Sequence, residues 1–364
     1  MLRRCKMTKR EVLCFLLGCI LTQFFSIEMN LLQDLQKQDK DAQNPSEVHE
    51  EKSLDPPTLT EDCLARFPPE KINFQQIAKI RTEDTEKYNS KKKTFMLTLI
   101  MTGPHYTDRR QAIRETWLSK TPSEHLYYFV IGTKNIPKHS LKDLNQENKV
   151  HKDLLLLSSF EDSYDNLSQK LLHMITWAYD NVDFEFIFKA DDDTFANVNK
   201  MYDLLNDEVY DKNLYWGYFY GKGNVKRSGQ WAEHDWFLCE HYLPNARGGG
   251  YVISRRLAGY VARNSELLQL YKSEDITLGT WMAPLNIKRQ HDIRFDTEYK
   301  SRGCHNSWIV THKQSMEDIR QKWRRLQFTA GDEICEEELS VSHGYEYRWD
   351  VPNKQCCVPD SSIP

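Results

Sequence analysis

The sequence predicts an α/β fold in which a mostly parallel sheet is flanked by helices, within a single folded domain. Apolar runs of strand length alternate with helical segments from residue 95 onward, a pattern typical of parallel sheets covered by helices. One of these runs, at 184–188, looks buried on both faces and leads directly into three consecutive aspartates. Before residue 91 the chain lacks this alternation, so we expect that part to lie outside the folded domain.

The amino terminus predicts a membrane anchor. Residues 12–27 read VLCFLLGCILTQFFSI, without any charge, and follow a basic stretch. A signal peptide is the alternative, but no small-x-small cleavage motif follows, which favours an uncleaved anchor. The basic residues place the tail in the cytosol and the rest of the chain in the lumen. We therefore expect a cytosolic tail at 1–11, a transmembrane helix at 12–27, a solvated stem at 28–90, the folded domain at 91–330 and a cysteine-containing extension at 331–364.

Charge and cysteine content narrow the choice of partners. The formal net charge is −4 and no polybasic face is visible, so we expect no nucleic-acid partner. An even number of cysteines in an oxidising lumen suggests three disulfides, with Cys356 and Cys357 bonded to different partners. The sequence contains no Cys-x-x-Cys pair, so we do not expect a zinc site. The six cysteines beyond the anchor are at 63, 239, 304, 335, 356 and 357.

The individual elements follow from apolar runs, helix-start residues and glycine turns. Thr107 is expected to cap the first helix of the domain. Glycines at 221, 223 and 229 predict a hairpin after the aromatic strand. Strands are predicted at 95–101, 126–132, 154–157, 184–188, 214–220, 251–253 and 308–312, and helices at 107–118, 140–153, 167–181, 197–209, 273–282 and from 315.

The aspartates after 184–188 predict a metal site. Three carboxylates at one strand end repel one another and lose hydration, which opposes folding unless a cation neutralises them. Alternation along an extended segment places Asp191 and Asp193 on one side and Asp192 on the other. The carboxyl end of such a strand is where α/β proteins bind ligands. A solvated acidic turn is the alternative, but the buried strand favours a divalent cation.

A histidine could complete this metal site. His312 ends a short predicted strand, and a shell of carboxylates and one imidazole suits Mn²⁺ better than Mg²⁺. A packed or solvent-facing histidine is the alternative. His291 is the rival ligand.

Two further groups are candidates for ligand contacts. Arg109, Arg110 and Arg114 stand at a strand-to-helix junction, where an anionic phosphate can bind. A surface charge or an ion pair is the more common role at such positions, and Arg110 and Arg114 are the candidates for a phosphate contact. Asp165 and Asn166 precede a helix, either as ligand contacts or as N-caps. Asn166 also opens an Asn-x-Ser sequon for N-glycosylation.

An acidic pair and a group of aromatic residues each have two interpretations. Glu274 and Asp275 begin a helix, where acidic residues are favoured by the helix dipole, but a carboxylate there could also serve as a general base. The aromatic residues at 214–220, with Trp231 and the residues after it, could stack against sugars. A core hairpin would have the same composition.

Several motifs in order resemble the inverting β1,3-glycosyltransferase family, which has a GT-A fold. Within the family, segments such as 215–219, 295–304 and 311–315 resemble members that build the proteoglycan linkage region. The motifs that carry the family resemblance are Arg109–Trp117, Asp162–Lys170, Lys189–Asp193, Gly248–Val252 and Glu274–Gly279.

This resemblance implies transfer of galactose from UDP-galactose, in β1,3 linkage, to the galactosyl-xylosyl-serine linker of proteoglycans. It implies a single-pass type II protein of the Golgi membrane with its catalytic domain in the lumen. It also implies Mn²⁺ bound by Asp193 and His312, with Asp191 through water, and Asp275 as the base. The remaining implied contacts are Arg110, Arg114, Asp165, Asn166, Lys170, Lys189, Asp192, Gly249 and Gly250 for the donor, and Trp216, Trp231 and Glu274 for the acceptor.

Three alternative functions stay open. The same fold could transfer N-acetylglucosamine, or could use a different acceptor. A non-catalytic luminal partner usually has a broken Asp-x-Asp pair, whereas the pair at 191 and 193 is intact. A metal-dependent phosphodiesterase would need more histidines near the carboxylates.

Overall fold

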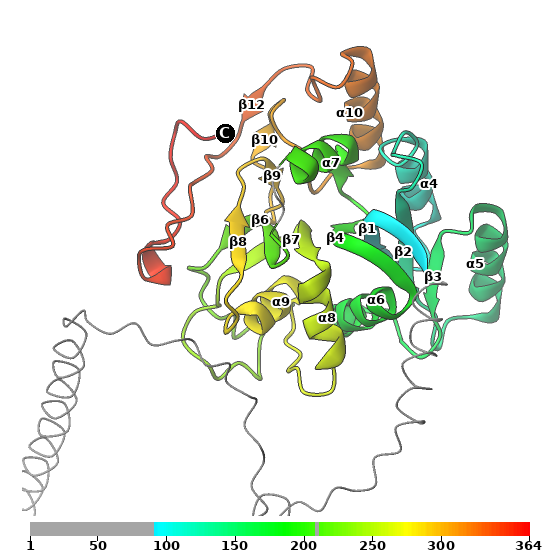
Figure 1. The fold of residues 1–364 in the computed structure, drawn as a ribbon, viewed down its shortest axis with the longest axis horizontal. Coiled ribbons are helices and arrows are strands. Elements are labelled where there is room, and N and C mark those ends of the chain that lie inside the picture. Colours follow the sequence, from blue (N-terminus) through cyan, green and yellow to red (C-terminus); the bar gives the residue numbers. More distant parts are fainter. Residues whose placement is uncertain (1–90, 208–210) are drawn as a thin grey trace, which may run out of the picture. The chain divides into compact units, whose positions relative to one another are not determined.

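The computed structural model describes residues 91–207 and 211–364 (Figure 1). The predicted tail, anchor and stem at 1–90 lie outside the described residues, and those assignments stay predictions. Within the described ranges, no helix combines the length and apolar character needed to cross a bilayer.

A seven-stranded sheet forms the centre of the fold, in the order β3-β2-β1-β4-β7-β6-β8. Strands β3, β2, β1 and β4 run parallel, as do β6 and β8, while β7 is antiparallel to both of its neighbours. The prediction of a mostly parallel sheet is therefore confirmed. The strands are β1 (Lys92–Met101), β2 (Leu126–Gly132), β3 (Leu154–Leu157), β4 (Val182–Asp191), β6 (Leu214–Tyr220), β7 (Asn245–Ser254) and β8 (Lys288–His291).

Helices cover both faces of this sheet. In Figure 1, α6, α8 and α9 lie together on one side and α4, α7 and α10 on the other. Helix α5 packs beside the edge strand β3. The helices are α4 (Thr107–Glu115), α5 (Lys138–His151), α6 (Leu167–Asn181), α7 (Val198–Asp207), α8 (Arg255–Arg263), α9 (Glu274–Met282) and α10 (Met316–Phe328).

The pairing of β1 with β4 sets the position of the site. Both strands are apolar on both faces, so they occupy the middle of the sheet, where helices cover them from two sides. Their parallel register ends with Met101 opposite Asp191. The turn after β1 and the aspartates after β4 therefore emerge at the same edge.

Several predicted boundaries differ from the structure. Thr107 is the first residue of α4, and the N-cap position belongs to Tyr106, so the prediction of a Thr107 cap is wrong. The glycines at 221, 223 and 229 do not form a tight hairpin. β6 pairs antiparallel with the next strand, β7, and the long connection between them, residues 221–244, contains one isolated bridge, Asn224 with His241. Gly248–Gly250 lie inside β7 rather than before it.

The disulfides correct another prediction. Cys304 bonds to Cys335, whereas the adjacent Cys356 and Cys357 bond to each other. Both members of the adjacent pair are fully buried, and the other described cysteine, Cys239, is free and exposed. Cys63 lies outside the described residues.

The carboxyl-terminal segment packs against β6 and β8. His291 is held on both sides: its Nδ1 accepts the backbone N–H of Phe219 at 3.0 Å, and its Nε2 donates to the carbonyl of Tyr345 at 2.7 Å. This pattern requires the neutral imidazole. Burial lowers the pKa of His291 to about 4.

Stability should therefore fall in acid because of His291. The imidazole titrates near 6.5 in the unfolded chain but near 4 in the fold, so its contribution is present above pH 6.5 and is lost as the pH falls toward 4. The difference corresponds to about 3 kcal/mol. Denaturant unfolding of H291Q, whose amide can make both hydrogen bonds without titrating, should show a shallower loss between pH 7 and 4.5. The exposed His234 gives a matched control, H234Q. Equal slopes for H291Q and wild type would contradict this assignment.

Candidate active site

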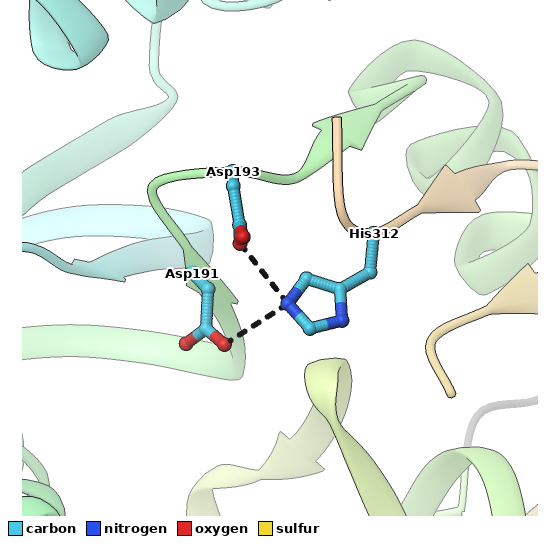
Figure 2. Close-up of side chains that lie close together, drawn as sticks. All are labelled: Asp191, Asp193 and His312. Carbon is cyan, nitrogen blue, oxygen red and sulfur yellow. Dashed lines mark ion pairs between the residues drawn. The ribbon is translucent and has the colours of Figure 1, made fainter. Parts of the chain in front are cut away.

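Asp191, Asp193 and His312 converge at the carboxyl end of β4 (Figure 2). The Nε2 atom of His312 lies 3.0 Å from Oδ1 of Asp193 and 3.4 Å from Oδ2 of Asp191. One oxygen or nitrogen ligand atom from each residue lies within 4.8 Å of the others. The three residues predicted from the sequence as metal ligands are therefore close enough to share one cation.

A small second sheet brings His312 to the aspartates. Strand β5 (Phe195–Ala196) follows the aspartate turn and pairs with β11 (Val310–Thr311), which in turn pairs with β9 (Phe295–Asp296). In this register Thr311 lies opposite Phe195, so the residue after β11 lies beside the turn before β5. The backbone N–H of His312 also donates to the carbonyl of Asp296 at 2.8 Å.

The imidazole of His312 is oriented toward the carboxylates. Its Nδ1 donates to the carbonyl of Glu298 at 3.3 Å, which leaves Nε2 facing Asp191 and Asp193. Nε2 is buried, and it makes no hydrogen bond of good geometry within the described part of the chain. A buried nitrogen between two carboxylates, fixed by a carbonyl on its far side, fits a metal ligand such as those that hold Mn²⁺.

Charge at this group also fits a cation site. Burial acts to lower the pKa of His312, but interactions with Asp191 and Asp193 outweigh it and raise that pKa to about 9. Without a metal ion, the imidazole therefore carries a proton at neutral pH. A divalent cation would replace that proton as the counter-charge of the two carboxylates.

Asp192 faces away from this group, as predicted. Its carboxylate accepts hydrogen bonds from Thr102 Oγ1 and from Arg109, each at 2.7 Å. Burial raises the pKa of Asp192, and these two donors oppose the rise. Arg109 lies at the junction singled out from the sequence but was not among the residues chosen there, yet it is a partly exposed cation of this edge, with 40 % of its side chain accessible. The sequence feature that could have identified Arg109 is its position as the first residue of the Arg109–Trp117 motif.

Arg110 and Arg114 do not face the site. The side chain of Arg110 is fully buried and forms an ion pair with Glu147 at 2.7 Å. Arg114 pairs with both Glu147 and Asp153 at 2.7 Å. Carboxylates of the protein thus neutralise both guanidinium groups in this structure, and the donor contacts expected of these arginines stay predictions.

Lys170 and Lys189 are also occupied inside the protein. Lys170 Nζ donates to Asp162 and to the carbonyl of Thr102, each at 2.6 Å. Lys189 Nζ lies 2.8 Å from Asp191 Oδ1 and also contacts Glu274. Burial acts to lower the pKa of Lys189, but these two carboxylates raise it above its usual range. Both lysines therefore have internal ion-pair partners in this structure, and their donor contacts stay predictions.

Glu274 is likewise internal. One carboxylate oxygen contacts Lys189 and the other is 3.4 Å from the hydroxyl of Tyr251. Burial raises the pKa of Glu274 above its usual range, Lys189 opposes that rise, and Asp275 adds to it. Both oxygens have partners inside the protein, and the expected acceptor contact stays a prediction.

Three glycines bring β7 close to both halves of the site. A Cβ atom at Gly249 would collide with the ring of His312. A Cβ atom at Gly248 would lie 3.0 Å from Glu274 Oε1 and 3.6 Å from Asp275 Cβ, and one at Gly250 would lie 3.0 Å from Val310. The same short segment therefore lies against the metal group and against the start of α9.

Asp275 is the carboxylate that remains available. It lies in the first turn of α9 and is partly exposed, and its Oδ1 accepts the adjacent backbone N–H of Ile276 at 2.8 Å. Among the described residues, no cationic side chain forms an ion pair with it. A carboxylate in this state can accept a proton from a bound hydroxyl group.

The aromatic candidates separate into core and surface. Trp216 is 1 % exposed, and its indole N–H donates to Asp292 at 2.9 Å, so it packs in the core here and its acceptor contact stays a prediction. Trp231 is partly exposed and packs edge-to-face on Tyr164, with ring centroids 6.0 Å apart. Tyr164 is 60 % exposed and was not selected, although it directly precedes Asp165.

The remaining candidates lie near the start of α6. Asp165 forms an ion pair with Lys272, and Asn166 donates to the carbonyl of Glu161 at 3.0 Å. Neither side chain caps α6. Their donor contacts and the glycosylation of Asn166 stay predictions. His291, the rival metal ligand, is not part of the group formed by Asp191, Asp193 and His312, and both of its nitrogens are hydrogen-bonded to the backbone.

Comparisons with known proteins point to one family. The galactosyltransferase family model matches residues 108–293. The chain is 43 % identical over 278 residues to β1,3-galactosyltransferase 6 of Mus musculus, which covers 75 % of this chain and 85 % of the relative. It is 30 % identical over 199 residues to UDP-GalNAc:β1,3-N-acetylgalactosaminyltransferase 2 of Mus musculus, covering 54 % and 38 %. It is 31 % identical over 236 residues to the probable β1,3-galactosyltransferase 5 of Arabidopsis thaliana, covering 61 % and 59 %. The chain thus spans most of the first relative and less than two thirds of the other two.

The metal group can be tested with the ion alone. Mn²⁺ should raise the unfolding temperature of the chelator-treated protein, since a ligand that binds only the folded state stabilises it by about 2.7 kcal/mol at a hundredfold excess over Kd. D193N and H312A should lose most of this shift. D203N, which alters an exposed aspartate of α7, serves as the control. If both site variants keep the full Mn²⁺ shift, these residues do not hold the ion.

Proposed function

The chain belongs to the galactosyltransferase family, and from this premise we propose that it transfers galactose from UDP-galactose, in β1,3 linkage, to the galactosyl-xylosyl-serine linker of proteoglycans. Family membership makes it a glycosyltransferase. The finer proposal is supported by the name of its 43 % identical relative and by the sequence motifs. We propose a GT-A arrangement for the mostly parallel sheet.

One observation carries the proposal: a candidate metal group and an unpaired carboxylate lie against the same glycine segment. The ring of His312 lies over Gly249, and the start of α9, with Asp275, lies against Gly248. Transfer from a nucleotide sugar needs a place for a charged leaving group and a base for the attacking hydroxyl. Both are present at one edge of the sheet.

The reaction that this arrangement supports is a single displacement. Mn²⁺ bound by Asp191, Asp193 and His312 would supply positive charge to a diphosphate leaving group. Asp275 takes the proton of the acceptor 3-hydroxyl while that oxygen bonds to C1 of galactose. The bond from C1 to the diphosphate oxygen breaks, and its electron pair leaves with UDP. Attack from the opposite face converts the α bond of the donor into a β bond, and no general acid is required.

The surroundings suggest which side each substrate occupies. We place the donor near Asp192, Arg109, Asp165 and Asn166, at the carboxyl ends of β1 and β4 and the start of α6. The acceptor would lie beside Trp231 and Tyr164, whose rings can pack on the apolar faces of sugars while their polar atoms meet hydroxyl groups.

We also propose that the protein is a single-pass type II protein of the Golgi membrane. The basic tail and the uncharged stretch at 12–27 support this topology. Two disulfides in the described part of the chain fit an oxidising lumen.

A direct assay tests the function. Full-length protein in detergent, supplied with Mn²⁺, should transfer galactose from UDP-galactose to a galactosyl-xylose acceptor, and linkage analysis should give a β1,3 bond. UDP-N-acetylglucosamine and UDP-N-acetylgalactosamine serve as competing donors. Preferential use of either, or no transfer from UDP-galactose, would overturn the proposed donor.

The role of Asp275 has its own test. D275N should lower kcat by about 10²-fold or more, because the amide cannot accept the acceptor proton, while UDP binding in the presence of Mn²⁺ stays at the wild-type level. Isothermal titration with UDP measures the second quantity. Parallel loss of UDP binding would show that the residue is structural rather than the base.

A further inference from the structure

Glu233 is a buried carboxylate outside the site described so far. It lies in the segment between β6 and β7, residues 221–244, and is only 3 % exposed. Its Oε2 accepts the backbone N–H of Lys272 at 2.7 Å. Lys272 stands three residues before Asp275, in the turn that leads into α9. Burying a carboxylate is costly, so this contact is a specific feature of the segment.

The turn before α9 depends on contacts from several elements. Tyr271 donates its backbone N–H to Thr277 Oγ1 at 3.1 Å, and its carbonyl accepts from Ser168 of α6. Ser273, the N-cap residue, makes no side-chain capping bond. The N–H of Lys272 is therefore satisfied from outside the turn, by Glu233.

Glu233 is itself held firmly. Its backbone N–H donates to the carbonyl of Lys226 at 2.8 Å, and Arg227 donates to the carbonyl of Glu233 at 2.9 Å. Trp236, three residues on, packs against Tyr271 with ring centroids 4.9 Å apart, within a small separate hydrophobic cluster. The segment and the turn thus pack as one unit, in which the Glu233 carboxylate has a fixed place.

We propose that Glu233 is a positioning residue for Asp275: by holding the N–H of Lys272, it fixes the turn that sets where α9 begins and where the base carboxylate points. This inference rests on the role of Asp275 given under the proposed function. Displacement of a reacting group by about 1 Å can cost on the order of 10²-fold in rate. A residue that never touches substrate can therefore control kcat through the backbone.

The segment 221–244 contains Trp231, one of the residues proposed to contact the acceptor, as well as Glu233. Trp231 precedes Glu233 by two residues and packs on Tyr164. The side chain of Lys272 pairs with Asp165, the neighbour of Tyr164. Glu233 therefore fixes the backbone between the aromatic pair and Asp275. Glu233 holds the backbone N–H of Lys272, whereas the pair with Asp165 is made by the Lys272 side chain. In the described part of the chain, no hydrogen bond or ion pair joins Glu233 to Asp192 or to its partners Thr102 and Arg109, so we expect its removal to spare nucleotide binding.

Glutamine offers a conservative replacement. The side chain of Glu233 accepts its hydrogen bond from a neutral backbone N–H, that of Lys272. An amide oxygen at the same place can accept the same backbone N–H. Alanine removes the acceptor and leaves that N–H without its partner.

The experiment compares E233A, E233Q and the matched control E240A, which removes an exposed carboxylate from the same segment. Full-length proteins are assayed with UDP-galactose, Mn²⁺ and galactosyl-xylose, and UDP binding and unfolding temperature are measured in parallel. E233A should lose about 10- to 100-fold in kcat while its Kd for UDP changes by less than about twofold. E233Q should stay within about threefold of wild type, and E240A should match wild type.

Amide hydrogen exchange gives a second readout that needs no substrate. Peptides covering 268–282 should exchange faster in E233A than in E233Q, with the rest of the domain unchanged. Wild-type kcat in E233A, unchanged exchange in this turn, or loss of UDP binding and unfolding temperature in step with kcat would each overturn the proposal. An inactive wild-type protein would contradict the proposed reaction, and exchange would still decide the role of Glu233.

Discussion

Neutralising three adjacent carboxylates at the end of a buried strand is the constraint on which the site depends. Each aspartate of Asp191–Asp193 obtains a different set of cations. Lys189 and His312 neutralise the first, Arg109 the second, and His312 with Lys313 the third. These partners come from β4, α4 and the segment after β11. Neutralising the three aspartates therefore brings together elements that are far apart in sequence.

The same constraint connects the metal group to the candidate base. Lys189 lies between Asp191 and Glu274, and Glu274 directly precedes Asp275 at the start of α9. One buried ammonium group therefore holds the metal side and the base side at a fixed separation, and the glycines of β7 allow that separation to be short. On the proposed function, the spacing between leaving group and base is thus part of the folded core rather than of a mobile loop.

Local patterns predicted much of this arrangement. Strands β2, β3 and β6 and helix α6 have the predicted bounds, and Asp192 faces away from its neighbours as alternation requires. Long-range pairing could not be predicted. The carboxylates of Glu147 and Asp153 that neutralise Arg110 and Arg114 leave no local signal, and an aromatic strand looks the same whether its tryptophan packs in the core or meets a sugar. The bond between Cys356 and Cys357 depends on burial that spacing does not reveal.

On the proposed function, Asp191, Asp193 and His312 hold a divalent cation beside the donor diphosphate. Crystals grown with Mn²⁺ and UDP can be measured at the manganese absorption edge to locate the ion. We expect one anomalous peak within coordination distance of Asp193 and of Nε2 of His312, next to the diphosphate oxygens. A UDP-bound structure with manganese elsewhere, and His312 still packed against the two carboxylates, would contradict it.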